Sequence, residues 1–228
     1  MKVKNLHDWK LSPKEAVKLQ EELRTKVVLR DEFENIRTIA GFDVGIRRGK
    51  DPKKKLRGIG ACVIMSYPDL NIMENHIIVT DVDYPYIPGL LSFRELPIII
   101  PLLEEIENEP DLIMMDGQGI AHPRRFGLAS HVGVILDKPS IGCAKSPLIG
   151  EYEEPGLESG SYRYIYHEGD VIGAVLRSRN GVKPIYISPG HKITVETCID
   201  IALNCCRGYR LPEPIREAHK LTRGRYEN

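Results

Sequence analysis

The sequence contains no long hydrophobic run, and this absence sets the first limit on what the protein can be. No stretch approaches the roughly 20 apolar residues that a membrane-spanning helix needs. Residues 1–5 (MKVKN) also lack the apolar centre of a secretory signal peptide. Hydrophobic residues make up 42% of the 228 and charged residues 28%, which is an ordinary globular balance. We therefore expect a cytoplasmic protein without membrane contact, folded as a single domain over residues 1–228.

The sequence also lacks a pattern of cysteines that would indicate disulfides or zinc binding, and it lacks a net charge. The five cysteines are an odd number without the spacing of zinc ligands, so we expect reduced core residues, with redox activity of the adjacent Cys205 and Cys206 as the alternative. The formal net charge is zero, which by itself argues against nucleic-acid binding. The charges are nevertheless segregated, with seven basic residues and one acid between Arg47 and Arg57. One basic face could therefore meet a polyanion, unless this run is only a solvated hairpin tip.

The order of the expected elements indicates an α/β protein. Ser12 and Glu15 form a capping box that begins a first helix. Hydrophobic periodicity predicts strands near 36–46, 56–66, 71–80, 112–115, 139–144, 170–177 and 184–188, and helices near 123–137, 193–206 and 213–222. The first three strands should form an antiparallel meander. The later alternation of strands and helices predicts a mixed sheet with helices on both faces.

Two aspartates follow hydrophobic segments that are predicted to be strands. Asp116 comes directly after the apolar run 112–115 and opens the glycine-rich segment 117–127, while Asp43 ends the β-rich segment 37–43. If the two strands are neighbours, the carboxylates lie side by side, and carboxylates with waters and phosphates are the ligands that Mg²⁺ prefers. An ionised carboxylate is rarely buried without such a partner. The alternative is that each aspartate is an ordinary turn residue at a strand end.

A turn stiffened by two prolines lies between the meander and Asp116. Its residues are Pro85, Tyr86, Ile87, Pro88 and Gly89. A rigid apolar turn of this kind can be inserted between bases, although packing of its aromatic side chain on the core is the alternative. A helix is expected to begin at Glu95, with Pro97 in its first turn and Pro101 kinking it or starting another. Glu95 is a third candidate metal ligand, or an ordinary acid that complements the helix dipole.

Taken together, these motifs resemble the endonuclease V family over the whole length of the chain. The matching segments are 41–45 (GFDVG), 85–89 (PYIPG), 93–95 (FRE), 116–127 (DGQGIAHPRRFG), 143–146 (CAKS), 211–214 (LPEP) and 218–219 (AH). The combination in this order is specific, whereas any one motif alone is weak. The resemblance implies an RNase H-like mixed β-sheet and an endonuclease that depends on Mg²⁺ or Mn²⁺.

The resemblance also implies roles for individual residues. Those of the reaction centre would be Asp43, Glu95, Asp116, His122 and Lys145. The three acids would hold the metal, which lowers the pKa of a water and steadies the displacement at phosphorus. The histidine would orient the attacking water or lie in the outer shell of the metal, and the lysine would neutralise charge near the scissile phosphate. Asp111 and His219 are weaker candidates, as groups that support the metal ligands.

The implied substrate is DNA that contains deoxyinosine. The turn Pro85–Gly89 would be the wedge, with Tyr86 filling the space beside the lesion. The flipped hypoxanthine would enter a pocket formed by Leu91, Gly117, Gly127 and Leu128. Hydrogen bonds to its O6 and N1–H would exclude adenine, which would leave polar groups of the pocket unpaired. Cleavage would fall at the second phosphodiester bond 3′ to the lesion, with 3′-hydroxyl and 5′-phosphate products. Inosine-containing RNA is the alternative substrate, and we expect a monomer.

Two other classes of protein fit part of the sequence. The segment 41–45 is similar to the first phosphate loop of sugar kinases and actin-like ATPases. The second Asp-Gly-Thr loop and the adenosine segment of those two-lobed proteins are missing, which argues against this class. A non-catalytic nucleic-acid-binding protein is the other alternative, and the presence of all three candidate metal acids argues against it.

Overall fold

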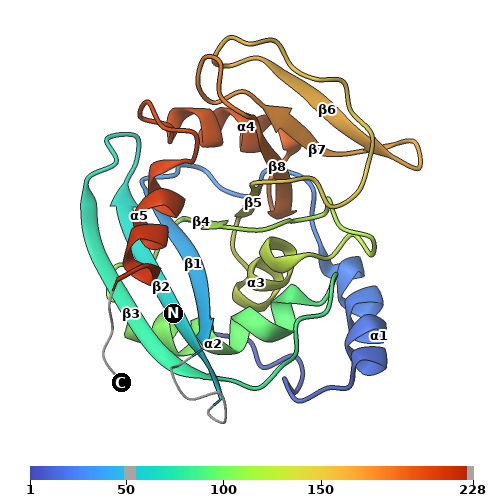
Figure 1. The fold of residues 1–228 in the computed structure, drawn as a ribbon, viewed down its shortest axis with the longest axis vertical. Helices are drawn as coiled ribbons and strands as arrows, with labels where there is room; N and C mark the ends of the chain where they lie inside the picture. Colours follow the sequence, from blue (N-terminus) through green and yellow to red (C-terminus); the bar gives the residue numbers. More distant parts are fainter. Residues whose placement is uncertain (49–54, 225–228) are drawn as a thin grey trace.

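A mixed β-sheet runs through the molecule (Figure 1). This computed structural model describes residues 1–48 and 55–224. The strands in these ranges are β1 (Thr38–Arg48), β2 (Leu56–Ser66), β3 (Ile72–Val82), β4 (Leu112–Met115), β5 (Ser140–Ala144), β6 (Tyr162–His167), β7 (Asp170–Leu176) and β8 (Ile185–His191). They form one sheet in the order β3-β2-β1-β4-β5-β8-β7-β6. The pairs β1–β4 and β4–β5 are parallel and the other neighbours are antiparallel, so the sheet is mixed as the sequence predicts.

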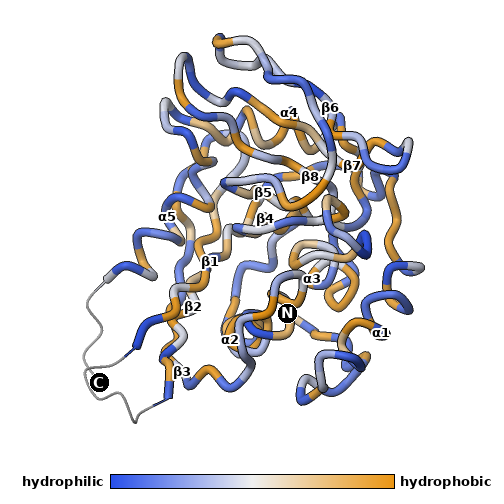
Figure 2. Tube along the Cα trace, turned by 45° about the vertical axis from the view of Figure 1, so that its right-hand side comes forward, coloured by the Kyte–Doolittle hydropathy of each residue, from blue (hydrophilic) through white to orange (hydrophobic). Residues whose placement is uncertain are grey.

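Helices cover both faces of this sheet. In the described ranges they are α1 (Pro13–Leu23), the short 3₁₀ helix η1 (Arg24–Lys26), α2 (Leu91–Glu105), α3 (Leu128–Leu136), α4 (Val195–Asn204) and α5 (Glu213–Thr222). Successive side chains of β1 point to opposite faces, so Ile39 packs with α4 and α5, while Ala40 packs with α2 and α3. Figure 2 shows hydrophobic stretches along the inner strands β1, β5 and β8. None of the described helices is both long and apolar enough to span a membrane.

The antiparallel meander β1–β2–β3 and the helix 213–222 confirm the sequence-based expectations, but other boundaries differ. α3 begins at Leu128 rather than near 123, because the preceding residues form a turn. In that turn Arg125 has a φ of 53°, and the Gly127 N–H donates to Gly119 O at 3.0 Å. The strand β6 is not predicted from the sequence at all.

α2 begins at Leu91, one turn before Glu95, so the predicted start of this helix is wrong. It runs through Pro97 and Pro101 as one helix, although each proline removes a hydrogen bond of the helix backbone. Its side chains that face the sheet are fully buried; they include Leu96, Ile99, Leu102 and Leu103. Tertiary packing of this apolar face therefore outweighs the local preference of the prolines.

α5 approaches β1 closely at two glycines of the strand, Gly41 and Gly45. A Cβ atom on Gly41 would lie 2.2 Å from the backbone carbon and oxygen of Pro214. A Cβ on Gly45 would lie 3.2 Å from the Cβ of Thr222. Because strand side chains alternate, Asp43 lies between these glycines on the same face. The C-terminal half of α5 is thereby placed over the Asp43 carboxylate.

We expect the substitution Gly41→Ala to destabilise the protein by about 1–3 kcal/mol, since the added methyl group can be accommodated only if α5 moves. Urea unfolding of the variant and the wild type would measure this loss. Gly156→Ala is the matched control, because an added Cβ there would meet only the Ser161 side chain, at 3.0 Å. Equal stability of Gly41→Ala and the wild type would contradict the close packing.

Candidate active site

Asp43 and Asp116 meet where β4 ends beside β1. Phe42 and Met115 are the last paired residues of the two strands, and the Asp116 N–H donates to Phe42 O at 3.3 Å. β1 continues to Arg48 along β2, so Asp43 lies in the middle of its strand and not at the strand end expected from the sequence. The sequence made closeness of the two carboxylates conditional on neighbouring strands, and the parallel pairing of β1 with β4 meets that condition. Their shared register brings the two carboxylates to one level of the sheet.

A group of metal-binding type is formed by Asp43, Asp116 and His219. One potential ligand atom from each of the three lies within 4.8 Å of the other two. His219 Nδ1 lies 3.1 Å from Asp43 Oδ2, and the Thr222 hydroxyl donates to the same oxygen at 2.5 Å. The Lys145 ammonium group donates to Asp116 Oδ2. Two carboxylates beside an imidazole are a donor set that can hold a divalent cation.

Glu95 enters the same space from the first turns of α2. This space, here called the acid cavity, has a volume of about 410 Å³ and is also lined by Asp43, Asp116, Lys145 and His219. Burial, and then the charges of Asp116 and Asp43, hold the pKa of Glu95 well above its usual range. Burial also raises the pKa of Asp116, although Lys145 opposes this shift. Glu95 does not belong to the 4.8 Å group of Asp43, Asp116 and His219, but negative charge on the three acids is mutually unfavourable, so this cavity fits a cation that would relieve the repulsion.

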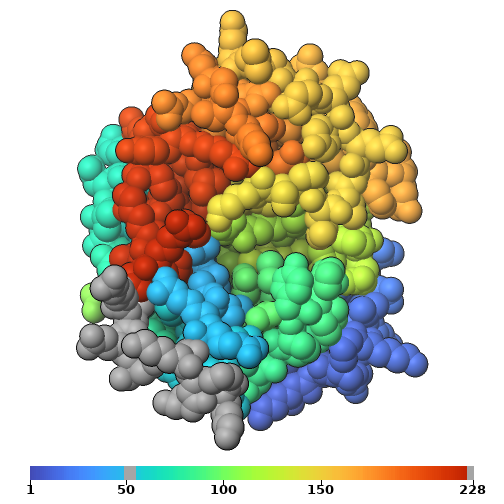
Figure 3. Space-filling model, viewed as in Figure 1, coloured from blue at the N-terminus to red at the C-terminus, as the bar shows by residue number. Residues whose placement is uncertain are grey.

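A second cavity, here called the side pocket, lies next to the acid cavity. It has a volume of about 290 Å³, and Asp116 and Lys145 line both cavities. Its other walls include Tyr86, Ile87, Pro88, Gly89, Leu91, Gly117, Gly127 and Leu128. In Figure 3 a hollow lies at the centre of the molecule, between α5, the segment after β5 and the segment before α2. The structure thus brings together four residues of the proline-stiffened turn and all four residues expected to form a pocket.

Tyr86 stands out from the proline-stiffened turn. Its side chain is 70% exposed, and the Arg94 guanidinium carbon lies 5.6 Å from the centre of its ring. Packing of this aromatic ring on the core, which the sequence left open, is therefore wrong. Ile87, in contrast, packs against the buried Leu90 and Phe93. Pro85 lines a different cavity from the rest of the turn.

His122 lies at the side pocket and does not line the acid cavity. Its Nε2 lies 3.0 Å from Gly89 O, and its Nδ1 accepts the Arg124 N–H at 3.2 Å. Burial, and then the positive charge of Arg124, lower the pKa of His122 to about 4. The imidazole is therefore neutral near pH 7, with Nε2 as its donor. Both ring nitrogens contact the backbone, and neither contacts a carboxylate of the acid cavity.

Asp111 is also away from the acid cavity, at the opposite end of β4 from Asp116. Its Oδ2 accepts the backbone N–H groups of Arg37 at 2.8 Å and Thr38 at 3.0 Å. These bonds join the beginnings of β1 and β4. The structure therefore gives Asp111 a role in strand alignment and does not place it beside the candidate metal ligands.

Sequence reasoning missed Thr222 and ranked His219 too low. The two side chains are three residues apart on α5, so they share a helix face, and this spacing on a predicted helix was an available signal. It also missed Gln20 and Gln118, which line the side pocket. Gln118 Nε2 donates to Ser146 O at 3.0 Å. Gln118 lies inside the glycine-rich segment 116–127, whereas no local pattern marks Gln20, because its partners come from distant parts of the chain.

Part of the basic run from Arg47 to Arg57 lies outside the described residues. Of the part that is described, Arg57 pairs with Asp81 at 2.7 Å and Lys55 with Asp83 at 2.6 Å. Arg47 donates to the carbonyl oxygen of Thr222 at 2.8 Å, at the end of α5, and also lines the acid cavity. Among the described residues, the lysine and arginine side chains that line the acid cavity are those of Arg47, Lys145 and Arg223.

Comparison with known proteins identifies relatives over nearly the whole chain. Residues 21–220 match the family described as Endonuclease V. A protein of Dehalococcoides mccartyi named Endonuclease V is 50% identical over 219 residues, which are 96% of this chain and 96% of the relative.

Solved structures agree with this relationship. The crystal structure of Endonuclease V from Bacillus subtilis has a TM-score of 0.91 and 30% sequence identity, and the match covers 97% of this chain and 95% of that one. Endonuclease V from Ciona intestinalis, in complex with a 23mer DNA containing an inosine followed by a ribo-adenosine, has a TM-score of 0.79 and 29% identity, over 93% of this chain and 97% of that one. The expected RNase H-like α/β fold is confirmed. The chain belongs to the endonuclease V family of nucleases.

Proposed function

We propose that the protein is a metal-dependent endonuclease that acts on DNA containing deoxyinosine. The observation that carries the proposal is that Asp116 and Lys145 line both the acid cavity and the side pocket. A base held in the side pocket would therefore bring phosphates of its own strand to the carboxylates. The Ciona relative, bound to DNA that contains inosine, supports this class of substrate.

The proposed reaction is hydrolysis of the second phosphodiester bond 3′ to the lesion, with 3′-hydroxyl and 5′-phosphate ends. Asp43, Asp116 and Glu95 supply the oxygen donors that suit Mg²⁺, with Mn²⁺ as a substitute. A bound metal of this kind lowers the pKa of a water and stabilises the displacement at phosphorus. His219 and Thr222 orient the Asp43 carboxylate through their contacts with its Oδ2.

Lys145 and His122 have different proposed roles. The Lys145 ammonium group lies against Asp116, where it would neutralise charge on the scissile phosphate. His122 is proposed to hold the proline-stiffened turn through Gly89 O, instead of orienting the attacking water, because both of its ring nitrogens are engaged. We further propose that the chain works as a single-domain monomer.

Tyr86 is the proposed wedge. It is an exposed aromatic side chain on a turn whose prolines restrict its motion, which is the geometry needed to replace a base in the stack. Flipping a base costs a few kcal/mol, and least at a mismatched or damaged pair, so the insertion itself favours the lesion. The side pocket beside Tyr86 would receive the hypoxanthine.

Inosine-containing RNA is the second candidate substrate. The strand bound by the Ciona relative carries a ribo-adenosine directly after the inosine. Nicking of matched DNA and RNA oligonucleotides, each with one inosine, would decide between the two candidates. Loss of both activities in EDTA would separate either nuclease from a non-catalytic binding protein.

Removal of either central carboxylate should abolish cleavage and leave the fold intact. We expect Asp43→Ala and Asp116→Ala each to nick a deoxyinosine duplex in Mg²⁺ more than roughly 100-fold more slowly, because each loses a metal ligand and little core packing. Asp200→Ala, at an exposed position of α4, is the control and should nick normally. Near-wild-type nicking by Asp43→Ala would refute the proposed metal site.

Loss of the Tyr86 side chain should weaken binding of the deoxyinosine duplex more than it slows bond cleavage. We expect Tyr86→Ala to bind a deoxyinosine duplex roughly ten- to a hundred-fold less tightly at matched salt, with little change on undamaged duplex. Gel-shift titrations with Ca²⁺ in place of Mg²⁺ would measure both affinities. Tyr162→Ala, which removes a partly exposed tyrosine on the edge strand β6, is the control. Equal weakening on the two duplexes would mean that Tyr86 is structural.

Replacement of Glu95 by glutamine should stabilise the metal-free protein. Because the pKa of folded Glu95 lies above its usual value of 4.5, the unfolded chain ionises first, and wild-type stability falls as the pH rises above about 4.5. A glutamine side chain does not ionise, so the Glu95→Gln variant does not lose stability in this way as the pH rises. We expect its melting temperature in EDTA to be higher than that of the wild type by roughly 2–4 °C at pH 8, with the difference vanishing near pH 4.5.

Saturating Mg²⁺ or Mn²⁺ should reduce or reverse this difference, because the metal stabilises the wild type more than the variant. Calorimetry across this pH range, with and without metal, would provide the measurement. A lower melting temperature of Glu95→Gln than of the wild type at pH 8 in EDTA would contradict the expectation that burial and the neighbouring carboxylates make ionised Glu95 destabilising.

A further inference from the structure

Three side chains converge on a single backbone oxygen at the end of the proline-stiffened turn. Gly89 O accepts hydrogen bonds from Gln20 Nε2 at 3.1 Å, from Arg124 Nη2 at 2.8 Å and from His122 Nε2 at 3.0 Å. The donors come from α1 and from the glycine-rich loop, which are about a hundred residues apart in the sequence. Gly89 has a φ of +80°, and a Cβ there would lie 2.7 Å from Arg124 Nη2. The three donor side chains therefore pack closely around the end of this turn.

Gln20 is the residue that connects the two walls of the side pocket. Its Nε2 also donates to Phe126 O at 3.0 Å, and its Oε1 accepts Arg124 Nε at 2.6 Å. Both amide hydrogens are thus used, one on Gly89 and one on the residue before Gly127. Gly89 and Gly127 both line the side pocket, as does Gln20 itself. A single nitrogen atom therefore links the carbonyl oxygen of Gly89 to that of Phe126.

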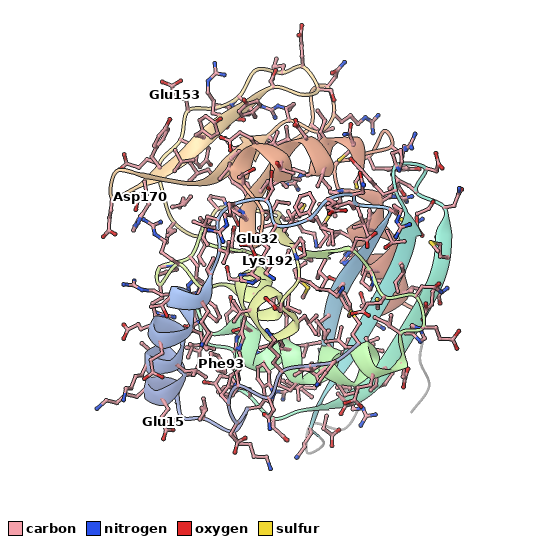
Figure 4. All side chains as sticks on the ribbon, turned by 180° about the vertical axis from the view of Figure 1, so that it is seen from behind. Glu15, Glu32, Phe93, Glu153, Asp170 and Lys192 are labelled. Atoms are coloured by element: carbon pink, nitrogen blue, oxygen red, sulfur yellow. The ribbon has the colours of Figure 1, made fainter. Side chains whose placement is uncertain are left out.

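The position of the Gln20 amide is itself determined by the packing of α1. Gln20 is only 1% exposed. On one side of it, Ala16 packs with Leu90 and Phe93, and on the other, Leu23 packs with Phe126. Figure 4 shows Phe93 beside α1. α1 thus packs against both segments that the Gln20 amide joins. The Gln20 side chain therefore has little freedom to follow a movement of the proline-stiffened turn.

We propose that Gln20 is a positioning residue that sets the width of the base pocket and thereby the preference for hypoxanthine over undamaged bases. This inference rests on the proposed function of the side pocket. Gln20 lines the side pocket and not the acid cavity, so its loss should relax the pocket and the wedge turn while the acid cavity is unchanged. The expected signature is weaker recognition at an unchanged rate of bond cleavage.

The test uses two substitutions of Gln20 in the full chain. Gln20→Met keeps the length of the side chain and removes all three hydrogen bonds. Gln20→Glu keeps an acceptor for Arg124 but places a carboxylate oxygen against Gly89 O and Phe126 O. Lys14→Met, at an exposed position in the first turn of α1, is the control. Melting temperatures establish that each variant is folded, and Gln20→Glu carries the test if Gln20→Met is not.

Binding to hypoxanthine-containing and undamaged duplexes is measured in Ca²⁺, and single-turnover nicking is measured at saturating enzyme in Mg²⁺. Both Gln20 variants should lose roughly ten-fold of the preference for the hypoxanthine duplex, while the saturated nicking rate stays near that of the wild type. An unchanged preference in either folded variant, or an equal loss on both duplexes, would overturn the role of Gln20. If the wild type itself does not nick the hypoxanthine duplex, the proposed function fails instead.

Discussion

The close packing of α5 on β1 is the constraint on which the candidate active site depends. The backbone of Pro214 occupies the space that a side chain at Gly41 would need, and Thr222 packs in the same way near Gly45. This approach requires glycine at position 41, while at Gly45 an added side chain would press on Thr222. As a result, the imidazole and hydroxyl groups of α5 reach a carboxylate that lies in the middle of a buried strand.

The carboxylates that line the acid cavity lower the stability of the metal-free protein, while they supply the proposed metal ligands. Burial and mutual repulsion raise the pKa values of Glu95 and Asp116, so in the absence of a cation the ionised cavity opposes folding. Sites that bind metals commonly carry such a penalty, since the ligands are arranged for an ion rather than for one another. The Lys145 ammonium group offsets part of it, and in the proposed reaction the same group would move from the carboxylate toward a phosphate.

In the proposed function, recognition and cleavage take place in adjacent cavities, because Asp116 and Lys145 line both of them. Asp116 is the point at which β4 ends and the glycine-rich loop begins, so the loop that forms the side pocket starts from a candidate metal ligand. The proline-stiffened turn meets this loop through Gly89 O, where α1 contributes Gln20. In the proposed function, an N-terminal helix that contains no catalytic group would still govern which base is accepted.

The sequence by itself determined the α/β class, the antiparallel meander and the family, because apolar periodicity and ordered motifs are local signals, whereas the pairing of the Asp43 and Asp116 strands came from the structure. The continuity of α2 and the contacts of the polar side chains at the two cavities were decided only by the tertiary structure. Pro97 and Pro101 remain in one helix because the apolar face of α2 is buried, and His122 faces Gly89 rather than the acids. The contacts of Gln20 and Thr222 join segments about 70 to 180 residues apart, and no local pattern records which distant backbone a polar side chain will meet.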